Sequence, residues 1–199
     1  ACRTIAQRYE ASFQRDFASL GLLAPHQEPR ATEYIPKMVG FIQTLVDRGV
    51  AYSAADGVYC SVRKISHYGE LSHQKLDQML EGVRVEPEAG KKEPLDFALW
   101  KKAKPEEPRW DSPWGAGRPG WHIECSTMAT DILGDQFDIH GGGQDLVFPH
   151  HENERAQALA AGKPFAMLWV HNGLLTVDGQ KMSKSVGNII RISEVLDKH

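Results

Sequence analysis

The sequence lacks the features that mark secreted and membrane-spanning proteins. Its 199 residues include only three cysteines, Cys2, Cys60 and Cys125, too few and too scattered for a disulfide framework. Its apolar runs, such as FAMLWV at 165–170, are far shorter than the roughly 20 residues that span a bilayer. No charged stretch followed by an apolar one opens the chain, as a secretory signal would. We therefore expect a cytoplasmic protein without membrane contacts.

A large excess of one charge is also lacking. The chain carries 23 basic and 26 acidic residues, a net charge of −3, so its overall charge gives no indication of nucleic-acid binding, which would need a local patch. With 41% hydrophobic and 25% charged residues, the composition is that of a globular protein with one sizeable core or two modest ones.

Apolar spacing predicts the elements of the first half. It indicates a helix over residues 3–20 that ends at Gly21, so that the chain begins almost inside a helix, as a truncated chain would. A second amphipathic helix follows from Ile35 and ends at Gly49. Residues 50–62 read as a hairpin around Asp56-Gly57. Residues 63–113 are polar, charged and rich in proline, and we expect an irregular insertion there rather than part of a main sheet.

The second half alternates between strand and helix patterns. GWHIEC (120–125) predicts a strand that runs into a helix starting near Ser126, and FDIHGGG (137–143) predicts the next strand. Pro149 opens a helix that continues through Ala161 to Gly162, and residues 167–177 form a further strand or hairpin. This alternation predicts an α/β fold with a parallel sheet.

The stretch DLVFPHHENE (145–154) is a candidate metal site. With Pro149 at the first helical position, His150 and Glu154 lie side by side one turn apart. Nitrogen and oxygen ligands at this spacing suit zinc, and Cys125 adds a thiolate from the preceding strand end. The alternative is an acidic first turn that complements the helix dipole, with an exposed histidine.

Hydrolytic alternatives fit this stretch poorly. HENER (151–155) has arginine where the zinc-protease motif H-E-x-x-H needs its second histidine. Glu152, the remaining candidate for a water-activating base, lies about 200° around an ideal helix from His150.

Two loops are candidates for ligand binding. IHGGGQD (139–145) places glycines at the end of a presumed parallel strand, where backbone can approach a ligand and where open α/β sheets bind ligands, although glycines also mark simple tight turns. His140 and Asp145 flank them and suit a small polar substrate. KMSKS (181–185) offers lysines and hydroxyls between Gly179 and Gly187, in a loop able to close over a triphosphate; the alternative is a solvated surface loop.

These motifs, in this order, resemble one family. KMSKS resembles the second signature of class I aminoacyl-tRNA synthetases, and RPGWHIECS (118–126) with 137–154 is similar to cysteinyl-tRNA synthetases. EPRAT (28–32), LDFALWK (95–101) and SPWGAGRPGW (112–121) resemble the same family. The resemblance implies part of a Rossmann-like catalytic domain: residues 1–50 as the helical remainder of its first half, 51–111 as a connective-peptide insertion, and 112–199 as its second half.

The resemblance also implies a reaction and its residues. ATP, with Mg²⁺, would activate cysteine to an adenylate, and the cysteinyl group would pass to tRNA(Cys). One zinc per subunit would bind the substrate thiolate and so select cysteine over serine, with Cys125, His150 and Glu154 matching three of its four ligands. The other implied contacts are Trp121, His140, Gly142 and Gly143 around the amino acid and ATP, Asp145 on the amino group or the ribose, and Lys181 and Lys184 on the ATP phosphates.

Two features of the family are missing from this sequence, and two other functions are alternatives to the one that the resemblance implies. The signature H-x-G-H and the fourth zinc ligand are absent, so we expect an internal fragment, monomeric, with a three-ligand site and little or no cysteine-dependent ATP–pyrophosphate exchange. One rival is the related ligase that joins cysteine to an amino sugar in mycothiol synthesis, in which we expect glutamine in place of His140 and a different residue in place of Glu154. The other is an interaction module with a closed, structural zinc site.

Overall fold

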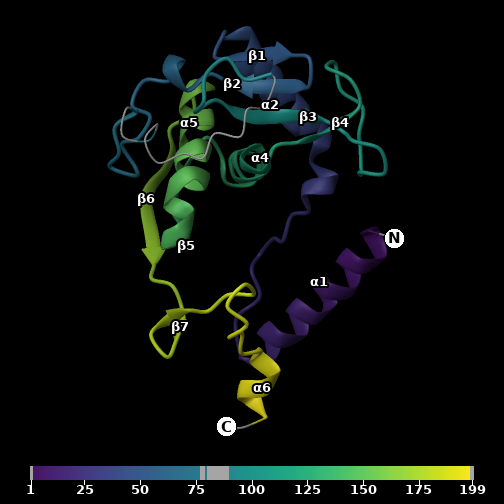
Figure 1. Cartoon of the computed structure of the whole chain (residues 1–199), viewed down its shortest axis with the longest axis vertical. Helices are drawn as coiled ribbons and strands as arrows, with labels where there is room; N and C mark the ends of the chain where they lie inside the picture. The colour runs from purple at the N-terminus through teal and green to yellow at the C-terminus, as the bar shows by residue number, and fades with distance from the viewer. Residues whose placement is uncertain (1, 77–78, 80–89, 198–199) are drawn as a thin grey trace. The chain divides into compact units, whose positions relative to one another are not determined.

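The computed structural model describes residues 2–76, 79 and 90–197 and is of mixed α/β type (Figure 1). It divides into two compact units, Ala1–Glu28 with Gly173–His199, and Pro29–Asn172. The second unit contains both hydrophobic clusters. Among the described residues of the first unit none is buried.

The first unit has few elements. Helix α1, Cys2–Ser19, confirms the predicted helix, and Gly21 follows it with a φ of +70°, a conformation that glycine adopts without steric cost. At the other end of the chain, β7 (Thr176–Val177) and β8 (Gln180–Lys181) form a short hairpin, and α6 covers Ile192–Leu196.

The second unit begins with the predicted amphipathic helix. Helix α2 spans Ile35–Asp47, and Gly49, two residues after its end, has a φ of +70°. Its buried side chains recur every three or four positions, the spacing of one helical face: Ile35, Met38, Phe41, Ile42 and Leu45.

An antiparallel sheet packs against this helix. Its strands are β1 (Ala51–Ala54), β2 (Gly57–Cys60), β3 (Phe97–Lys102) and β4 (Gly117–Pro119), hydrogen-bonded in that order. The predicted hairpin is confirmed, with Ala54 paired to Gly57. The fully buried side chains of Leu99 and Trp100 in β3 join α2 in the main hydrophobic cluster.

The expectation of an irregular segment over 63–113 is wrong for β3. This strand lies in the middle of the sheet, between β2 and β4. Its apolar residues are flanked by charged and proline-rich stretches, which conceal a short strand whose partners come from distant parts of the sequence. Residues 77–78 and 80–89 of this segment lie outside the described residues.

The predicted strand at GWHIEC is also wrong. The chain leaves β4 at Gly120 and enters helix α4, Trp121–Leu133, five residues before the expected start. The side chains that α4 buries, Ile123, Ser126, Thr127 and Thr130, have helical spacing. Three of the four are small and polar, so they carry little of the apolar periodicity that marks a helix in sequence.

Residues 136–172 form a parallel βαβ unit, as the alternation of strand and helix patterns predicts. Strand β5 (Gln136–Gly143) pairs in parallel with β6 (Phe165–Asn172), and helix α5 (Glu152–Ala160) lies between them in sequence. A 3-10 turn, Gln144–Leu146, and a single turn, Val147–His151, lead into α5, which ends before Gly162 as predicted. The parallel sheet is confirmed for these two strands only, because β4 joins the antiparallel sheet.

Candidate metal centre

Helices α4 and α5 pack against each other and carry the candidate ligands. Cys125 lies in the second turn of α4, so its predicted place at a strand end is wrong. His150 lies in the turn that leads into α5, and Glu154 lies in the first turn of that helix. Ser126, next to Cys125, donates from its Oγ to Gln157 Oε1 at 2.6 Å and so joins the two helices at this level.

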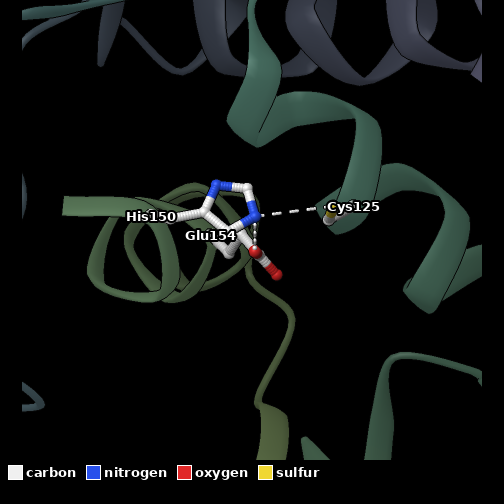
Figure 2. A group of neighbouring side chains, drawn as sticks. All are labelled: Cys125, His150 and Glu154. Carbon is white, nitrogen blue, oxygen red and sulfur yellow. Dashed lines mark hydrogen bonds and ion pairs between the residues drawn. The ribbon is translucent and has the colours of Figure 1, made fainter. Parts of the chain in front are cut away.

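The structure brings the three predicted metal ligands together (Figure 2). The Nε2 atom of His150 lies 2.7 Å from Oε1 of Glu154 and 3.7 Å from the Sγ atom of Cys125, and one ligand atom from each residue falls within 4.8 Å of the others. The exposed fractions of His150 and Glu154 are 5% and 0%. The alternative of an exposed histidine in a solvated first turn is therefore wrong.

The spacing of these atoms suits a zinc ion. With Zn–S near ~2.3 Å and Zn–N near ~2.0 Å, a tetrahedral site sets sulfur and nitrogen about 3.5 Å apart, close to the 3.7 Å between Cys125 and His150. The His150–Glu154 pair is closer and would have to open by about half an ångström or more.

The carboxylate of Glu154 is the clearest indication of a cation. Its second oxygen, Oε2, lies 3.1 Å from Nε2 of His140 on β5. Each oxygen thus has one imidazole nitrogen within ion-pair distance, and neither has a hydrogen-bond donor aligned with it. Burial by itself would raise the pKa of Glu154, yet the nearby His140 and His150 outweigh it and hold the pKa below its ordinary value. A buried anion without aligned donors is costly unless a cation compensates it.

Without a metal, Cys125 is a thiol. Burial, together with the nearby Glu154 and Glu124, raises its pKa to about 12. Metal binding requires the thiolate and therefore releases this proton.

A second group of potential ligands shares the same carboxylate. His140, His151 and Glu154 also place one ligand atom each within 4.8 Å of one another. His151 is hydrogen-bonded through Nδ1 to Nε2 of His171 on β6, at 2.7 Å. Burial, reinforced by the neighbouring histidines, lowers the pKa of His151 to about 4, so this ring is neutral near pH 7.

Two aromatic residues of α4 border His150. Trp121 stacks on its ring with centroids 3.9 Å apart, while 56% of Trp121 remains exposed. His122 lies behind His150, with the two Nδ1 atoms 2.8 Å apart. Burial, and then repulsion by His150, lower the pKa of His122 to about 4.

The glycines at the end of β5 allow close approach within the site. A Cβ on Gly142 would lie 2.6 Å from Cε1 of His151, and one on Gly143 would lie 2.6 Å from Oδ1 of Asp145. Side chains at these positions would therefore displace a histidine of the second ligand group and an exposed aspartate. Whether either glycine contacts a substrate stays a prediction.

Glu152 is a structural hydrogen-bond acceptor rather than the water-activating base that a hydrolase would need. Its buried carboxylate accepts hydrogen bonds from the backbone amides of Gly69, at 2.9 Å, and Ser72, at 2.8 Å. It thus fixes the 69–72 segment to α5 and has no part in the metal-ligand groups.

The KMSKS loop belongs to the other unit, so Lys181 and Lys184 are described within that unit alone. Asn188 closes the loop: its Oδ1 accepts from the amide of Ser183 at 2.9 Å, and its Nδ2 donates to the carbonyl of Lys181 at 3.2 Å. Lys184 is exposed in the following turn, and Gly187 has a φ of +76°.

Sequence reasoning missed three of the histidines, His122, His151 and His171, as members of this cluster. A correct start for α4 would have revealed His122, since it precedes Cys125 by three residues and so shares its helical face. His171 is opposite Gly142 in the parallel register, a contact for which the sequence contains no local signal.

No helix in the described part of the chain combines the length and apolar character that crossing a membrane requires.

Comparison with known proteins shows the family of this chain. The family described as tRNA synthetases class I (C) catalytic domain matches residues 1–199. The chain is 56% identical over 198 residues to a cysteine–tRNA ligase of Syntrophobacter fumaroxidans, covering 99% of the chain and 40% of the relative. It is 54% identical over 200 residues to that of Thermodesulfovibrio yellowstonii, and 56% identical over 197 residues to that of Pseudomonas aeruginosa; these alignments cover 98% of the chain and 41% and 43% of the relatives.

The chain thus spans about two fifths of the length of these curated relatives. Because the family match extends from the first residue to the last, the chain belongs to the catalytic-domain family of class I (C) tRNA synthetases.

Proposed function

We propose that this chain is part of the catalytic region of a cysteine–tRNA ligase, in which Cys125, His150 and Glu154 hold one zinc ion. The observation that carries the proposal is the convergence of a thiol, an imidazole and a carboxylate without aligned donors in one buried place. When bound, the ion would supply a preference for sulfur over oxygen ligands. The substrates would be cysteine, ATP with Mg²⁺, and tRNA(Cys), and the enzyme would act as a cytoplasmic monomer.

We also propose contacts with the substrates for residues in both units of the chain. Trp121 covers one face of His150 and leaves its own outer surface accessible, which suits packing against a small amino acid. His140, Gly142, Gly143 and Asp145 would line the same pocket. Lys181 and Lys184 would contact the phosphates of ATP and stabilise the charge of the departing pyrophosphate.

The larger architecture is proposed on the same basis. Residues 112–199 would form the second half of a Rossmann-like domain, which the parallel pair β5–β6 supports. Residues 1–50 would be the helical remainder of the first half, and residues 51–111 a connective-peptide insertion.

Selection of cysteine over serine follows from the ligand set. The two amino acids differ in one atom, and an apolar pocket discriminates poorly on so small a difference. A site that binds the deprotonated thiol rewards the sulfur directly. A separate hydrolytic editing site is then unnecessary.

Cobalt substitution tests this proposal. The chain is loaded with Co²⁺, and its absorption spectrum is followed as cysteine or serine is added. An open site with the proposed role predicts a change with cysteine and none with serine. A structural zinc site, already closed by protein ligands, would bind Co²⁺ and respond to neither; that result would refute the proposal.

The acceptor is tested with the full-length protein. We expect cysteine transfer to tRNA(Cys) and none to the amino sugar of mycothiol synthesis. We expect the two candidate enzymes to differ at His140 and Glu154. The Nε2 atom of His140 lies 3.1 Å from Oε2 of Glu154 in this chain, so the expected difference lies at the proposed metal site itself.

A further inference from the structure

His122 is next to the candidate metal ligand His150, on the side away from Cys125 and Glu154. The Nδ1 atoms of the two imidazoles are 2.8 Å apart. The other ring nitrogen of His150, Nε2, faces the sulfur and the carboxylate. One ring of His150 therefore connects His122 to the ligand group.

This contact allows only two arrangements of a single proton. Two Nδ1 atoms at hydrogen-bond distance need one hydrogen between them, and each neutral imidazole has one N–H. If His150 donates, its Nε2 keeps a free lone pair. If His122 donates, the hydrogen of His150 is on Nε2 and blocks metal binding there.

The surroundings of His122 fix its ring. Phe97 of β3 meets it edge-on, with centroids 5.6 Å apart, and Trp121 stacks on it at 5.5 Å. Trp121 also stacks on His150 at 3.9 Å. The two imidazoles are thus confined together, and the hydrogen bond between them has little freedom to rearrange.

We propose that His122 is a positioning residue of the metal site: its Nδ1 accepts a hydrogen bond from the Nδ1–H group of His150, and this presents the Nε2 lone pair of His150 to the ion. This inference rests on the proposed function. A ligating histidine commonly donates its second N–H to a neighbouring group, which fixes the tautomer and ring orientation and strengthens the ligand. Here the neighbour is a second histidine, on helix α4.

The test compares two variants of the whole chain. In His122→Asn the side-chain oxygen occupies the δ position and accepts a hydrogen bond, whereas His122→Leu has nearly the same shape and cannot accept one. We expect His122→Leu to weaken zinc binding about 10- to 100-fold, and His122→Asn to remain within a few-fold of the wild type. Zinc affinity is measured by competition with a chromophoric chelator.

Controls separate positioning from folding. His26→Leu, at an exposed position of the other unit, should leave the affinity unchanged. Thermal unfolding of each metal-free variant shows whether the fold survives. If His122→Leu does not fold, ¹⁵N NMR of the metal-free wild type decides: a protonated Nδ1 and an unprotonated Nε2 in His150 support the proposal, and the reverse refutes it.

The outcomes distinguish this inference from the proposed function. A wild type that binds zinc while His122→Leu binds it equally well refutes the positioning role and leaves the metal site intact. Equal weakening in the Asn and Leu variants also refutes it, because shape rather than hydrogen bonding would then matter. A wild type that binds no zinc refutes the proposed metal site, and this inference with it.

Discussion

At the scale of single residues, the site depends on which side chains share the carboxylate of Glu154. His150 approaches one of its oxygens and His140 the other. The group with Cys125 and the group with His140 and His151 therefore compete for the same carboxylate. Zinc accepts thiolate, imidazole and carboxylate donors together, and the thiol of Cys125 is present in the first group only. We therefore propose that the ion is bound by Cys125, His150 and Glu154 rather than by the second group.

Substitution distinguishes the two groups. In Cys125→Ser, zinc affinity should fall by more than the roughly 10- to 100-fold that the loss of a supporting hydrogen bond costs, because a ligand itself is lost. In His151→Asn it should change by only a few-fold. The control is Cys2→Ser, which removes an exposed thiol and should have no effect. The opposite ranking of Cys125→Ser and His151→Asn would place the ion in the second group.

The sequence predicted part of this site for a local reason. His150 and Glu154 are four residues apart in the stretch that Pro149 predicts to be helical, and this spacing alone predicts their contact. The contacts of Glu154 with His140, and of His151 with His171, join different elements, and periodicity within one segment contains no information about them. Tertiary packing alone brings those residues together.

At the scale of elements, helix α4 controls the site, since it carries Trp121, His122 and Cys125. Its start is fixed at Gly120, whose amide donates to the carbonyl of Leu99 at 2.8 Å. The chain passes so close to β3 here that a Cβ on Gly120 would lie 2.0 Å from the carbonyl oxygen of Ala98. Only glycine allows this approach.

Gly120→Ala should therefore move α4 away from the sheet. We expect a loss of unfolding free energy on the order of 1–3 kcal/mol, typical of overpacking, and weaker zinc binding because Cys125 moves with the helix. The matched control is Gly40→Ala in α2, at an exposed position with open space around it, which should stabilise the chain by about 0.5–1 kcal/mol. Urea denaturation measures both; an unchanged Gly120→Ala variant would contradict the role of this contact.

The two errors of element prediction have one origin. The start of α4 was missed because its buried face is largely serine and threonine, and β3 was missed because charged flanks surround its apolar residues. Both elements acquire their stability from neighbours that are remote in sequence. Elements with a full apolar stripe, such as α2, were predicted well because the spacing of their own apolar residues reveals which face is buried.

At the scale of the whole chain, burial is concentrated in one unit. Every described buried residue lies within Pro29–Asn172, together with all the candidate metal ligands. Helix α1 buries none of its residues, so it lacks the packed apolar face from which helices in proteins gain most of their stability.

A chain reduced to residues 29–172 should therefore keep its fold and its metal site. We expect a thermal unfolding midpoint within a few degrees of that of the 199-residue chain, and the same zinc affinity within a few-fold. Calorimetry and chelator competition measure the two. Loss of a cooperative transition in the shorter chain would show that the first unit contributes stability beyond the burial seen here.

The buried histidines make the free energy of unfolding of the metal-free chain depend on pH. The pKa values of His122 and His151 are lowered from 6.5 to about 4, so between these values the unfolded chain binds more protons than the folded one. Stability of the metal-free chain should therefore be complete above pH 6.5 and decrease as the pH falls toward 4. Urea denaturation at pH 7.5, 6, 5 and 4.5 measures this decrease, and His151→Asn, which removes one of the two groups, should make it shallower. A free energy of unfolding that stays constant or rises between pH 6.5 and 4.5 would show that these rings accept protons in the folded chain.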